Sequence, residues 1–343
     1  MHPPKLGIFL SEPSRTQYAG AISAACGRDI AAELIVHRGD TPLGATTLPK
    51  IDVAFLSAEM IGQSGDADPD ANMNAFFGSL VAAPNLKWLH VYSAGTDKPV
   101  YRQLARRGVV ITHSSGANAK AVAHTAMAGM LALARDVPLW VRAQDKRHWQ
   151  TQRREASPAD LVGATVVIVG LGPIGREIAL LCKAFGMHVL GVRRSAEPIS
   201  ACDVVYAQSD LAGALAQTSW LVLACPLTNE TRNLIDAAML AKLPSNARII
   251  NVGRGGVVNE SALLRCLVEG TIAGAYSDVF ETEPLPADSP LWSAPNFLLS
   301  AHSAGSSVGF GGRAATIFIE NLKRWIRQGP LVNVAKFDEA GAA

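Results

Sequence analysis

The stretch Thr165-Val166-Val167-Ile168-Val169-Gly170-Leu171-Gly172-Pro173-Ile174-Gly175 joins a β-branched apolar run to the pattern G-x-G-x-x-G. The apolar run predicts a short strand that is buried on both faces. Beyond it, Ile174, Ile178 and Leu181 recur at helical spacing, and His188 to Val192 predicts a second strand. The stretch therefore predicts a strand, a helix and a second strand in succession, which is one βαβ unit of a parallel sheet.

The glycines of this unit favour a dinucleotide-binding site over an ordinary turn between strand and helix. Gly170 suits the tight turn, Gly172 lets a pyrophosphate approach the backbone, and Gly175 lets the helix lie close to the strand. The helix that begins at Pro173 and Ile174 directs unpaired N–H groups at the anion. We expect residues 170 to 175 to bind the cofactor.

The residues at the end of the second strand predict which nucleotide binds. An NAD site usually has Asp or Glu there, to bind the ribose 2′-hydroxyl. Here the residues are Arg193, Arg194 and Ser195. Two guanidinium groups and a hydroxyl suit a 2′-phosphate, whereas a carboxylate would repel it. We expect NADP(H) to be preferred, with NAD(H) as the alternative if both arginines are merely solvated.

Composition limits the class of protein. The 343 residues are 49% hydrophobic and 17% charged, which is enough apolar sequence for a large core and for two domains. The net charge is +2 without a long basic block, so nucleic acid is not an expected partner. The five cysteines show no C-x-x-C pattern, and neither a signal-peptide pattern nor a membrane-spanning apolar run is present. We expect a cytoplasmic protein.

Strands and helices alternate along the chain, which predicts α/β architecture with parallel sheets. Before residue 117, strands are expected at 6–10, 33–37, 51–56 and 86–92, helices at 20–32 and 71–83, and a loop at 62–72. A long apolar helix is expected over 119–139, where it must be buried, and a polar connector over 142–160. Later strands are expected at 220–224, 247–252 and 274–280, and helices at 211–217, 260–269 and 313–327. Doubly wound sheets are the simplest interpretation.

Several separated motifs resemble the D-isomer-specific 2-hydroxyacid dehydrogenases, over about residues 85 to 334. Besides 170–175, they are Tyr92 to Asp97, Cys225 to Thr231, Asn251 to Gly255, Ser277 to Pro284, Pro290 to Trp292 with Pro295 and Asn296, and Ala301 to Gly305. The resemblance implies a Rossmann cofactor domain, 118–302, inserted in a flavodoxin-like substrate domain, 1–117 plus 303–343. It also implies a cleft between the domains and a homodimer.

Three residues supply the groups that reduction of a 2-keto acid requires. The reaction needs a proton donor for the keto oxygen and a cation for the carboxylate. His302 follows an apolar run and precedes a Gly/Ser loop, and Glu283 could pair with its imidazole. Arg254 stands at the end of a predicted strand among glycines that would leave space for a ligand, and its planar fork matches a carboxylate. We expect these three to be catalytic, and no metal, since no ligand cluster has the required spacing.

The resemblance assigns supporting roles to further residues. Backbone N–H groups of Ser93, Ala94 and Gly95 would bind the substrate carboxylate as the neutral counterpart to Arg254, and His302 would contact the keto oxygen of the substrate. Asp278 would accept a hydrogen bond from the nicotinamide amide, or else cap a strand end. Pro226, Thr228, Val252 and Gly253 would lie along the cofactor.

The sequence departs from the family pattern at two places in the matched region. Ala123-His124 replaces a common Ala-Glu, and Ser300-Ala301-His302 replaces a common Thr-Pro-His. Neither change removes a catalytic atom, but the second affects how His302 is presented. The first 84 residues match only loosely, and substrate selectivity is expected to reside there.

The leading hypothesis is an NADPH-dependent reductase of a small 2-keto acid, such as glyoxylate or hydroxypyruvate, that forms the D-hydroxy acid. A formate-dehydrogenase-like hydride abstractor is the first alternative, although such relatives usually pair the histidine with glutamine rather than with Glu283. A dinucleotide-sensing interaction protein, as in the related corepressors, is the second. Rapid turnover of a keto acid would exclude it.

Overall fold

The computed structural model describes residues 3–60, 71–151 and 160–337. Most of the loop expected over 62–72 and part of the connector expected over 142–160 lie outside these ranges. The chain forms two compact units, one of Met1–Ala117 with Ser307–Ala343 and the other of Asn118–Ser306. The second unit is thus inserted in the first, and it ends at Ser306 rather than at 302. Within the described ranges, no helix has the length and hydrophobicity needed to cross a membrane.

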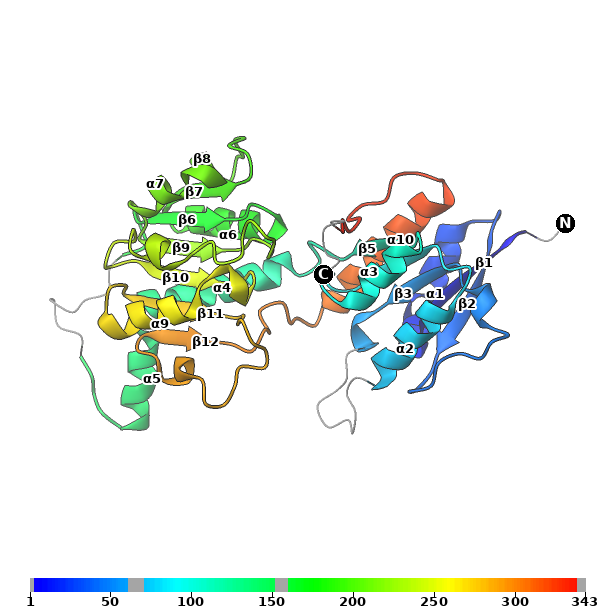
Figure 1. Ribbon diagram of the computed structural model, residues 1–343, viewed down its shortest axis with the longest axis horizontal. Helices are drawn as coiled ribbons and strands as arrows, with labels where there is room; N and C mark the ends of the chain where they lie inside the picture. Colours follow the sequence, from blue (N-terminus) through cyan, green and yellow to red (C-terminus); the bar gives the residue numbers. More distant parts are fainter. Residues whose placement is uncertain (1–2, 61–70, 152–159, 338–343) are drawn as a thin grey trace. The chain divides into compact units, whose positions relative to one another are not determined.

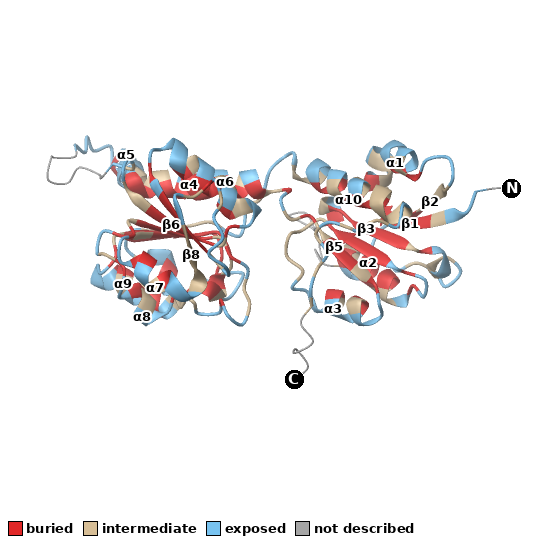
Figure 2. Cartoon of the chain, turned by 90° about the horizontal axis from the view of Figure 1, so that it is seen from above, coloured by how far each residue is buried: buried red, intermediate tan, exposed pale blue. Residues whose placement is uncertain are grey.

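The first unit is a parallel sheet of five strands between two layers of helices (Figure 1). The strands are β1 (Lys5–Ser11), β2 (Ala31–His37), β3 (Val53–Leu56), β4 (Trp88–Val91) and β5 (Val110–His113), in the order β2-β1-β3-β4-β5. Helices α1 (Glu12–Cys26) and α10 (Phe310–Ile326) cover one face, and α2 (Ala71–Ala82) and α3 (Pro99–Arg106) cover the other (Figure 2). This strand order is that of flavodoxin, as expected.

The second unit is a parallel sheet of seven strands. The strands are β6 (Thr165–Val169), β7 (His188–Arg193), β8 (Val204–Ala207), β9 (Trp220–Leu223), β10 (Arg248–Asn251), β11 (Gly274–Ser277) and β12 (Phe297–Leu299), in the order β12-β11-β10-β9-β6-β7-β8. Helices α4 (Ala119–Ala134), α5 (Val137–Asp145) and α6 (Pro173–Ala184) lie on one side, and α7 (Leu211–Leu215), α8 (Ala237–Leu240) and α9 (Glu260–Glu269) lie on the other (Figure 2). The order reverses next to β6, as in a Rossmann fold, so the doubly wound prediction is confirmed.

Two helix boundaries differ from the prediction for local reasons. Helix α1 begins at Glu12 rather than near residue 20, because the Ser11 hydroxyl accepts the Ser14 N–H and caps the helix. The long helix expected over 119–139 is interrupted, because Asp136 adopts left-handed φ of 54° and a new helix, α5, begins at Val137 with Pro138 in its first turn. The start of the expected irregular connector is therefore helical as far as Asp145.

Among the α-helices and strands of the described residues, some short elements were not predicted from the sequence. They are α3, β5, β8 and α8, which span four to eight residues each. Strands β5 and β8 lie at sheet edges and their residues are only partly buried at several positions, so their sequences lack the long apolar run that marks a central strand. The amphipathic helix expected over 313–327 is α10, which begins earlier, at Phe310.

A buried histidine closes a polar network inside the first sheet. His90 is fully buried on β4, with Nδ1 2.7 Å from the Thr112 hydroxyl and Nε2 3.0 Å from the Ser114 hydroxyl. The Ser114 hydroxyl donates to Val91 O, so it accepts from Nε2–H, and Nδ1 is left as an acceptor. Burial, with a smaller contribution from the charge of His113, lowers the pKa of His90 to about 3. The network therefore favours the neutral ring.

This histidine should make stability depend on pH. Because the pKa is lowered in the folded state, the unfolded chain takes up a proton first as the pH falls below about 6.5. We expect the free energy of unfolding to fall by about 1.4 kcal/mol per pH unit between pH 6 and pH 4 from this group alone. Urea unfolding across that range measures the slope. His90→Gln should be less stable at pH 7 but have a shallower slope, and equal slopes in the two proteins would contradict this origin.

Candidate active site

The glycine turn after β6 leaves space at only one of its three glycines. A Cβ atom on Gly170, whose φ is 94°, would lie 2.6 Å from Cys225 N, and one on Gly175 would lie 1.9 Å from Gly170 O. At Gly172, which caps the N-terminus of α6, nothing lies within 4 Å of the added atom. Gly170 and Gly175 thus serve the turn and the packing of the helix on the strand, whereas Gly172 presents open backbone to a ligand.

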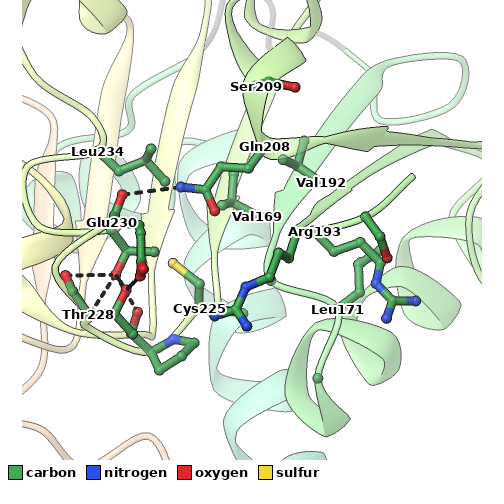
Figure 3. Close-up of a pocket in the computed structure, with 17 residues that line it drawn as sticks. Val169, Leu171, Val192, Arg193, Gln208, Ser209, Cys225, Thr228, Glu230 and Leu234 are labelled. Atoms are coloured by element: carbon green, nitrogen blue, oxygen red, sulfur yellow. Dashed lines mark hydrogen bonds between the residues drawn. The ribbon is translucent and has the colours of Figure 1, made fainter. Parts of the chain in front are cut away.

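A cavity of about 950 Å³ opens at this turn, along the carboxyl ends of several strands (Figure 3). Arg193 lies on one side of it, and Thr228 and Glu230 lie on the other. Seven residues predicted to bind the cofactor line it: Gly170, Gly172, Arg193, Arg194, Ser195, Pro226 and Thr228. Pro173, Ile174, Gly175, Val252, Gly253 and Asp278 are not among its lining residues. The cavity has the position and size that a dinucleotide requires.

Other residues that line this cavity were not predicted from the sequence. They are chiefly Gln208, Ser209, Cys225, Glu230, Thr231 and Leu234. Gln208 and Ser209 follow β8, so recognition of that strand would have placed them at the same sheet edge. The Gln208 side-chain amide donates to Glu230 O at 3.1 Å. Burial raises the pKa of the Cys225 thiol to about 11, so it lines the cavity as a neutral group.

Acidic side chains lie near both arginines of the predicted phosphate site. Arg193 Nη1 is 3.5 Å from the Glu197 carboxylate, and in this pair the glutamate is exposed while the arginine is partly buried. A hydrogen bond from the Thr228 hydroxyl lowers the pKa of Glu230, and the charge of Arg194 contributes further. Exposed ion pairs of this kind are weak. A bound phosphate group could therefore displace both carboxylates from the arginines with little loss of interaction free energy.

His302 and Glu283 form a close pair. His302 Nδ1 lies 2.6 Å from Glu283 Oε2, and the other carboxylate oxygen accepts the Phe280 N–H at 2.9 Å. The carboxylate is thus fixed at both oxygens, and it fixes the ring in turn. With Nδ1 engaged, Nε2 is the ring nitrogen that can exchange a proton with a substrate. The histidine side chain is 50% exposed, so a ligand can reach it.

The carboxylate of Asp278 is engaged by the loop that carries His302. Oδ1 accepts the Ser300 hydroxyl at 2.5 Å and the Ser303 N–H at 2.9 Å, and Oδ2 accepts the Ala304 N–H at 3.0 Å. The side chain is 3% exposed. These contacts are those of a cap at the end of β11, which was the alternative to a nicotinamide contact. Oδ2 accepts only the Ala304 N–H among these hydrogen bonds, so it can accept one more.

Arg254 is held in a turn that follows β10. The Asn251 side chain accepts the Gly253 N–H at 3.1 Å and donates to Arg254 O at 3.2 Å, which fixes the backbone on both sides. The expectation that the flanking glycines leave space for a ligand is wrong for Gly253 and Gly255. Added Cβ atoms there would lie 2.7 Å from Cys225 O and 1.9 Å from Phe280 C, because neighbouring strand ends pack against the turn.

The remaining predicted substrate residues belong to the first unit. Ser93, Ala94 and Gly95 form a loop after β4, in which the Ser93 hydroxyl donates to Gly95 O at 2.7 Å. In the second unit, an apolar cavity of about 440 Å³ adjoins His302 and Glu283 and includes Trp292 in its wall. Across residues 3–60, 71–151 and 160–337, no three His, Cys, Asp or Glu side chains group as metal ligands would.

Comparison with known proteins identifies the family. A sequence profile of the D-isomer specific 2-hydroxyacid dehydrogenase, NAD binding domain, matches residues 127–304. The chain belongs to the D-isomer-specific 2-hydroxyacid dehydrogenases. As a member, it is an NAD(P)-dependent oxidoreductase, and the cavity at Gly172 lies in the matched domain.

Individual relatives of this dehydrogenase agree with the assignment. Glyoxylate/hydroxypyruvate reductase B of Pectobacterium carotovorum is 34% identical over 298 residues, which cover 86% of this chain and 90% of that protein. D-3-phosphoglycerate dehydrogenase of Methanocaldococcus jannaschii is 31% identical over 250 residues, which cover 71% of this chain but 46% of that protein.

Solved structures show the same fold. A D-isomer specific 2-hydroxyacid dehydrogenase from Xanthobacter autotrophicus, in complex with NADPH and MES, gives a TM-score of 0.74 at 29% identity and covers 96% of this chain and 98% of that one. The NADPH-dependent glyoxylate/hydroxypyruvate reductase from Sinorhizobium meliloti, in complex with NADP and sulfate, gives 0.70 at 26% identity with the same coverage.

Proposed function

We propose that this dehydrogenase reduces a small 2-keto acid, such as glyoxylate or hydroxypyruvate, to the D-2-hydroxy acid and prefers NADPH. The observation that carries the proposal is the 2.6 Å contact between His302 and Glu283, beside a half-exposed ring. The names of the Pectobacterium and Sinorhizobium relatives support the substrate class. The pairing with glutamate rather than glutamine favours keto-acid reduction over a formate-dehydrogenase-like reaction.

Each catalytic residue has one task in this proposal. The bound nicotinamide supplies the hydride that reaches the keto carbon. His302 donates a proton from Nε2 to the keto oxygen, and Glu283 holds the ring in place through its contact with Nδ1. Arg254 binds the carboxylate through its planar fork and polarises the carbonyl. Backbone N–H groups of Ser93, Ala94 and Gly95 contribute neutral donors to the same carboxylate.

The cofactor would be held chiefly by the cavity at Gly172. The open backbone there and the first turn of α6, at Pro173, Ile174 and Gly175, fit a pyrophosphate. In this proposal Arg193, Arg194 and Ser195 bind the 2′-phosphate and Pro226 and Thr228 follow the dinucleotide. Val252 and Gly253 lie near its nicotinamide end, and Asp278 accepts the nicotinamide amide through Oδ2.

Replacing Arg193 by Asp should reverse the cofactor preference. The carboxylate would repel a 2′-phosphate and could bind a 2′-hydroxyl instead. We expect KM for NADPH to rise by about 10- to 100-fold, equivalent to loss of one charge-assisted hydrogen bond, and KM for NADH to change by less than about 3-fold. Steady-state kinetics with both cofactors measures this.

The matched control is Glu197→Gln, which removes the acidic partner of Arg193 and keeps the arginine. It should leave KM for NADPH unchanged or slightly lower. An equal rise in KM for NADPH and NADH in the Arg193→Asp variant would rule out the phosphate contact.

The reaction itself is tested by the loss of absorbance at the nicotinamide band. Glyoxylate and hydroxypyruvate are supplied with NADPH and NADH side by side. Fast oxidation of NADPH and slow oxidation of NADH supports the whole proposal. Activity with NADH alone would preserve the reaction and reject the phosphate site. If neither cofactor is oxidised, with these two substrates or with a wider panel of keto acids, the dinucleotide-sensing alternative would be favoured.

We also propose that the enzyme is a homodimer. Helix α5 carries Trp140 and Val141 about half exposed, and Trp149 beyond its end is 91% exposed. Large apolar side chains exposed together are typical of an interaction surface. Light scattering after gel filtration should give twice the monomer mass, and a Trp140→Glu variant should give a monomer; a monomeric parent protein would contradict the proposal.

A further inference from the structure

A chain of hydroxyl groups lies beneath the loop that carries His302. The Tyr276 hydroxyl is 2.7 Å from the Ser300 hydroxyl, which in turn is 2.5 Å from Asp278 Oδ1. Tyr276 and Asp278 belong to β11 and its end, whereas Ser300 directly follows β12. The three side chains therefore connect two neighbouring strands at the sheet edge where the candidate active site lies.

The direction of these hydrogen bonds follows from the number of protons. Ser300 has a single hydroxyl proton, and it is donated to the carboxylate of Asp278. The Tyr276 hydroxyl must then donate to the Ser300 oxygen. Burial raises the pKa of Tyr276, so the phenol keeps its proton at working pH. The chain runs in one direction, from Tyr276 through Ser300 to Asp278, and each bond polarises the next.

The ring of Tyr276 is fixed by close packing against α4. A Cβ atom on Gly129 would lie 2.6 Å from Tyr276 Cγ, so the ring lies directly on the helix backbone at that glycine. The residue is 5% exposed. Since the ring cannot move toward the helix, its hydroxyl stays at a fixed position for Ser300.

Asp278 in turn holds the backbone around His302 by hydrogen bonds. Its carboxylate accepts the N–H groups of Ser303 and Ala304, and its main-chain oxygen accepts the His302 N–H at 2.8 Å. His302 has φ of 48°, a left-handed conformation that costs a residue other than glycine about 1 to 3 kcal/mol. Such a conformation persists only where surrounding contacts hold it, and here the contacts come from Asp278.

We propose that Tyr276 and Ser300 are positioning residues for catalysis, which hold Asp278 so that His302 keeps its ring against Glu283. This inference rests on the proposed role of His302 as the proton donor. Loss of the Ser300 hydroxyl would remove one of the donors to Asp278 Oδ1 and leave the Tyr276 hydroxyl without this acceptor. The His302 loop would then sample other conformations, and productive contact with the keto oxygen would become rarer.

The test compares Ser300→Ala, Tyr276→Phe and Ser300→Thr in the full-length enzyme with hydroxypyruvate and NADPH. We expect kcat to fall about 10- to 100-fold in Ser300→Ala and about 3- to 10-fold in Tyr276→Phe, as for modest misplacement of a catalytic group. Ser300→Thr keeps the hydroxyl and should retain kcat within about 3-fold. KM for hydroxypyruvate and the Kd of NADPH, measured by fluorescence, should change by less than about 3-fold.

A second measurement separates positioning from a general loss of structure. The solvent deuterium isotope effect on kcat should increase in Ser300→Ala and Tyr276→Phe, because proton donation by His302 becomes slower relative to other steps. Thr271→Val is the matched control, since it removes an exposed hydroxyl that donates to Cys266 O in the same unit. It should change neither kcat nor the isotope effect. Tyr276→Phe keeps the ring packed on Gly129, so this variant still tests the positioning role if Ser300→Ala folds poorly.

His302→Gln in the same assay separates the positioning role of Tyr276 and Ser300 from the role of His302 as the proton donor. If it abolishes turnover while Ser300→Ala and Tyr276→Phe both keep kcat within about 2-fold, the positioning role is wrong and the role of His302 stands. A loss of NADPH affinity at unchanged kcat in these two variants also overturns it, because the network would then serve the cofactor. If His302→Gln keeps full turnover, the role of His302 as proton donor fails and this inference fails with it, although the reduction itself is still observed.

Discussion

Replacing His302 by Gln should lower kcat for hydroxypyruvate by about 10²- to 10⁴-fold, the range that general acid catalysis by one side chain supplies. Glutamine fills a similar volume and can still accept or donate a hydrogen bond, but it cannot deliver a proton to the keto oxygen. This is the largest effect that we expect from a single substitution.

Binding should survive this change. Neither the cavity at Gly172 nor the turn at Arg254 depends on the imidazole, so the Kd of NADPH should stay within about 3-fold of the original value. Stopped-flow measurement of a single turnover separates chemistry from product release. A His302→Gln variant that turns over within about 5-fold of the parent enzyme would show that another group donates the proton.

Replacing Arg254 by Lys should lower kcat/KM for hydroxypyruvate by about 10²-fold, the second largest effect. Lysine keeps the charge but loses the planar fork, so one of two parallel hydrogen bonds to the carboxylate is lost, at about 1.5 to 3 kcal/mol. The turn itself should persist, because Asn251 holds it through backbone groups of Gly253 and Arg254. Most of the effect should appear in KM, and the rest in kcat if the arginine also polarises the carbonyl.

Arg248→Lys is the control for this substitution. Arg248 is the first residue of β10, the strand that precedes the turn of Arg254, and its guanidinium lies 5.3 Å from the centre of the Trp220 ring. It should change kcat/KM by less than about 3-fold. Equal losses in the two variants would indicate a general effect on the sheet, and no loss in Arg254→Lys would remove the residue from carboxylate binding.

The sequence predicted the fold well where its signals were local. The β-branched run at Thr165–Val169 and the glycines after it define β6 and its turn. The alternation of strands and helices along the chain predicted the doubly wound sheets. Strands β5 and β8 were missed, because each has only four residues at a sheet edge and so lacks the long apolar run that marks a central strand. The break in the long apolar helix depends on one left-handed residue, Asp136, that apolar periodicity does not reveal.

The candidate site was predictable in its residue types but not in its contacts. His302 and Glu283 were paired from their chemistry, yet their 2.6 Å contact depends on a loop that Asp278 holds from another strand. The packing of Gly253 and Gly255 against neighbouring strand ends, and the reach of Tyr276 to Ser300, also arise between elements far apart in the sequence. Such contacts follow from strand order and register, which periodicity alone does not supply.

The proposed reaction is the reduction of a 2-keto acid to the D-2-hydroxy acid. The most direct test is to identify the product. Hydroxypyruvate is incubated with NADPH and the purified enzyme, and the glycerate formed is resolved by chiral chromatography and compared with the amount of cofactor oxidised. We expect D-glycerate in a one-to-one ratio with oxidised NADPH. L-Glycerate, or oxidation of cofactor without glycerate, would contradict it.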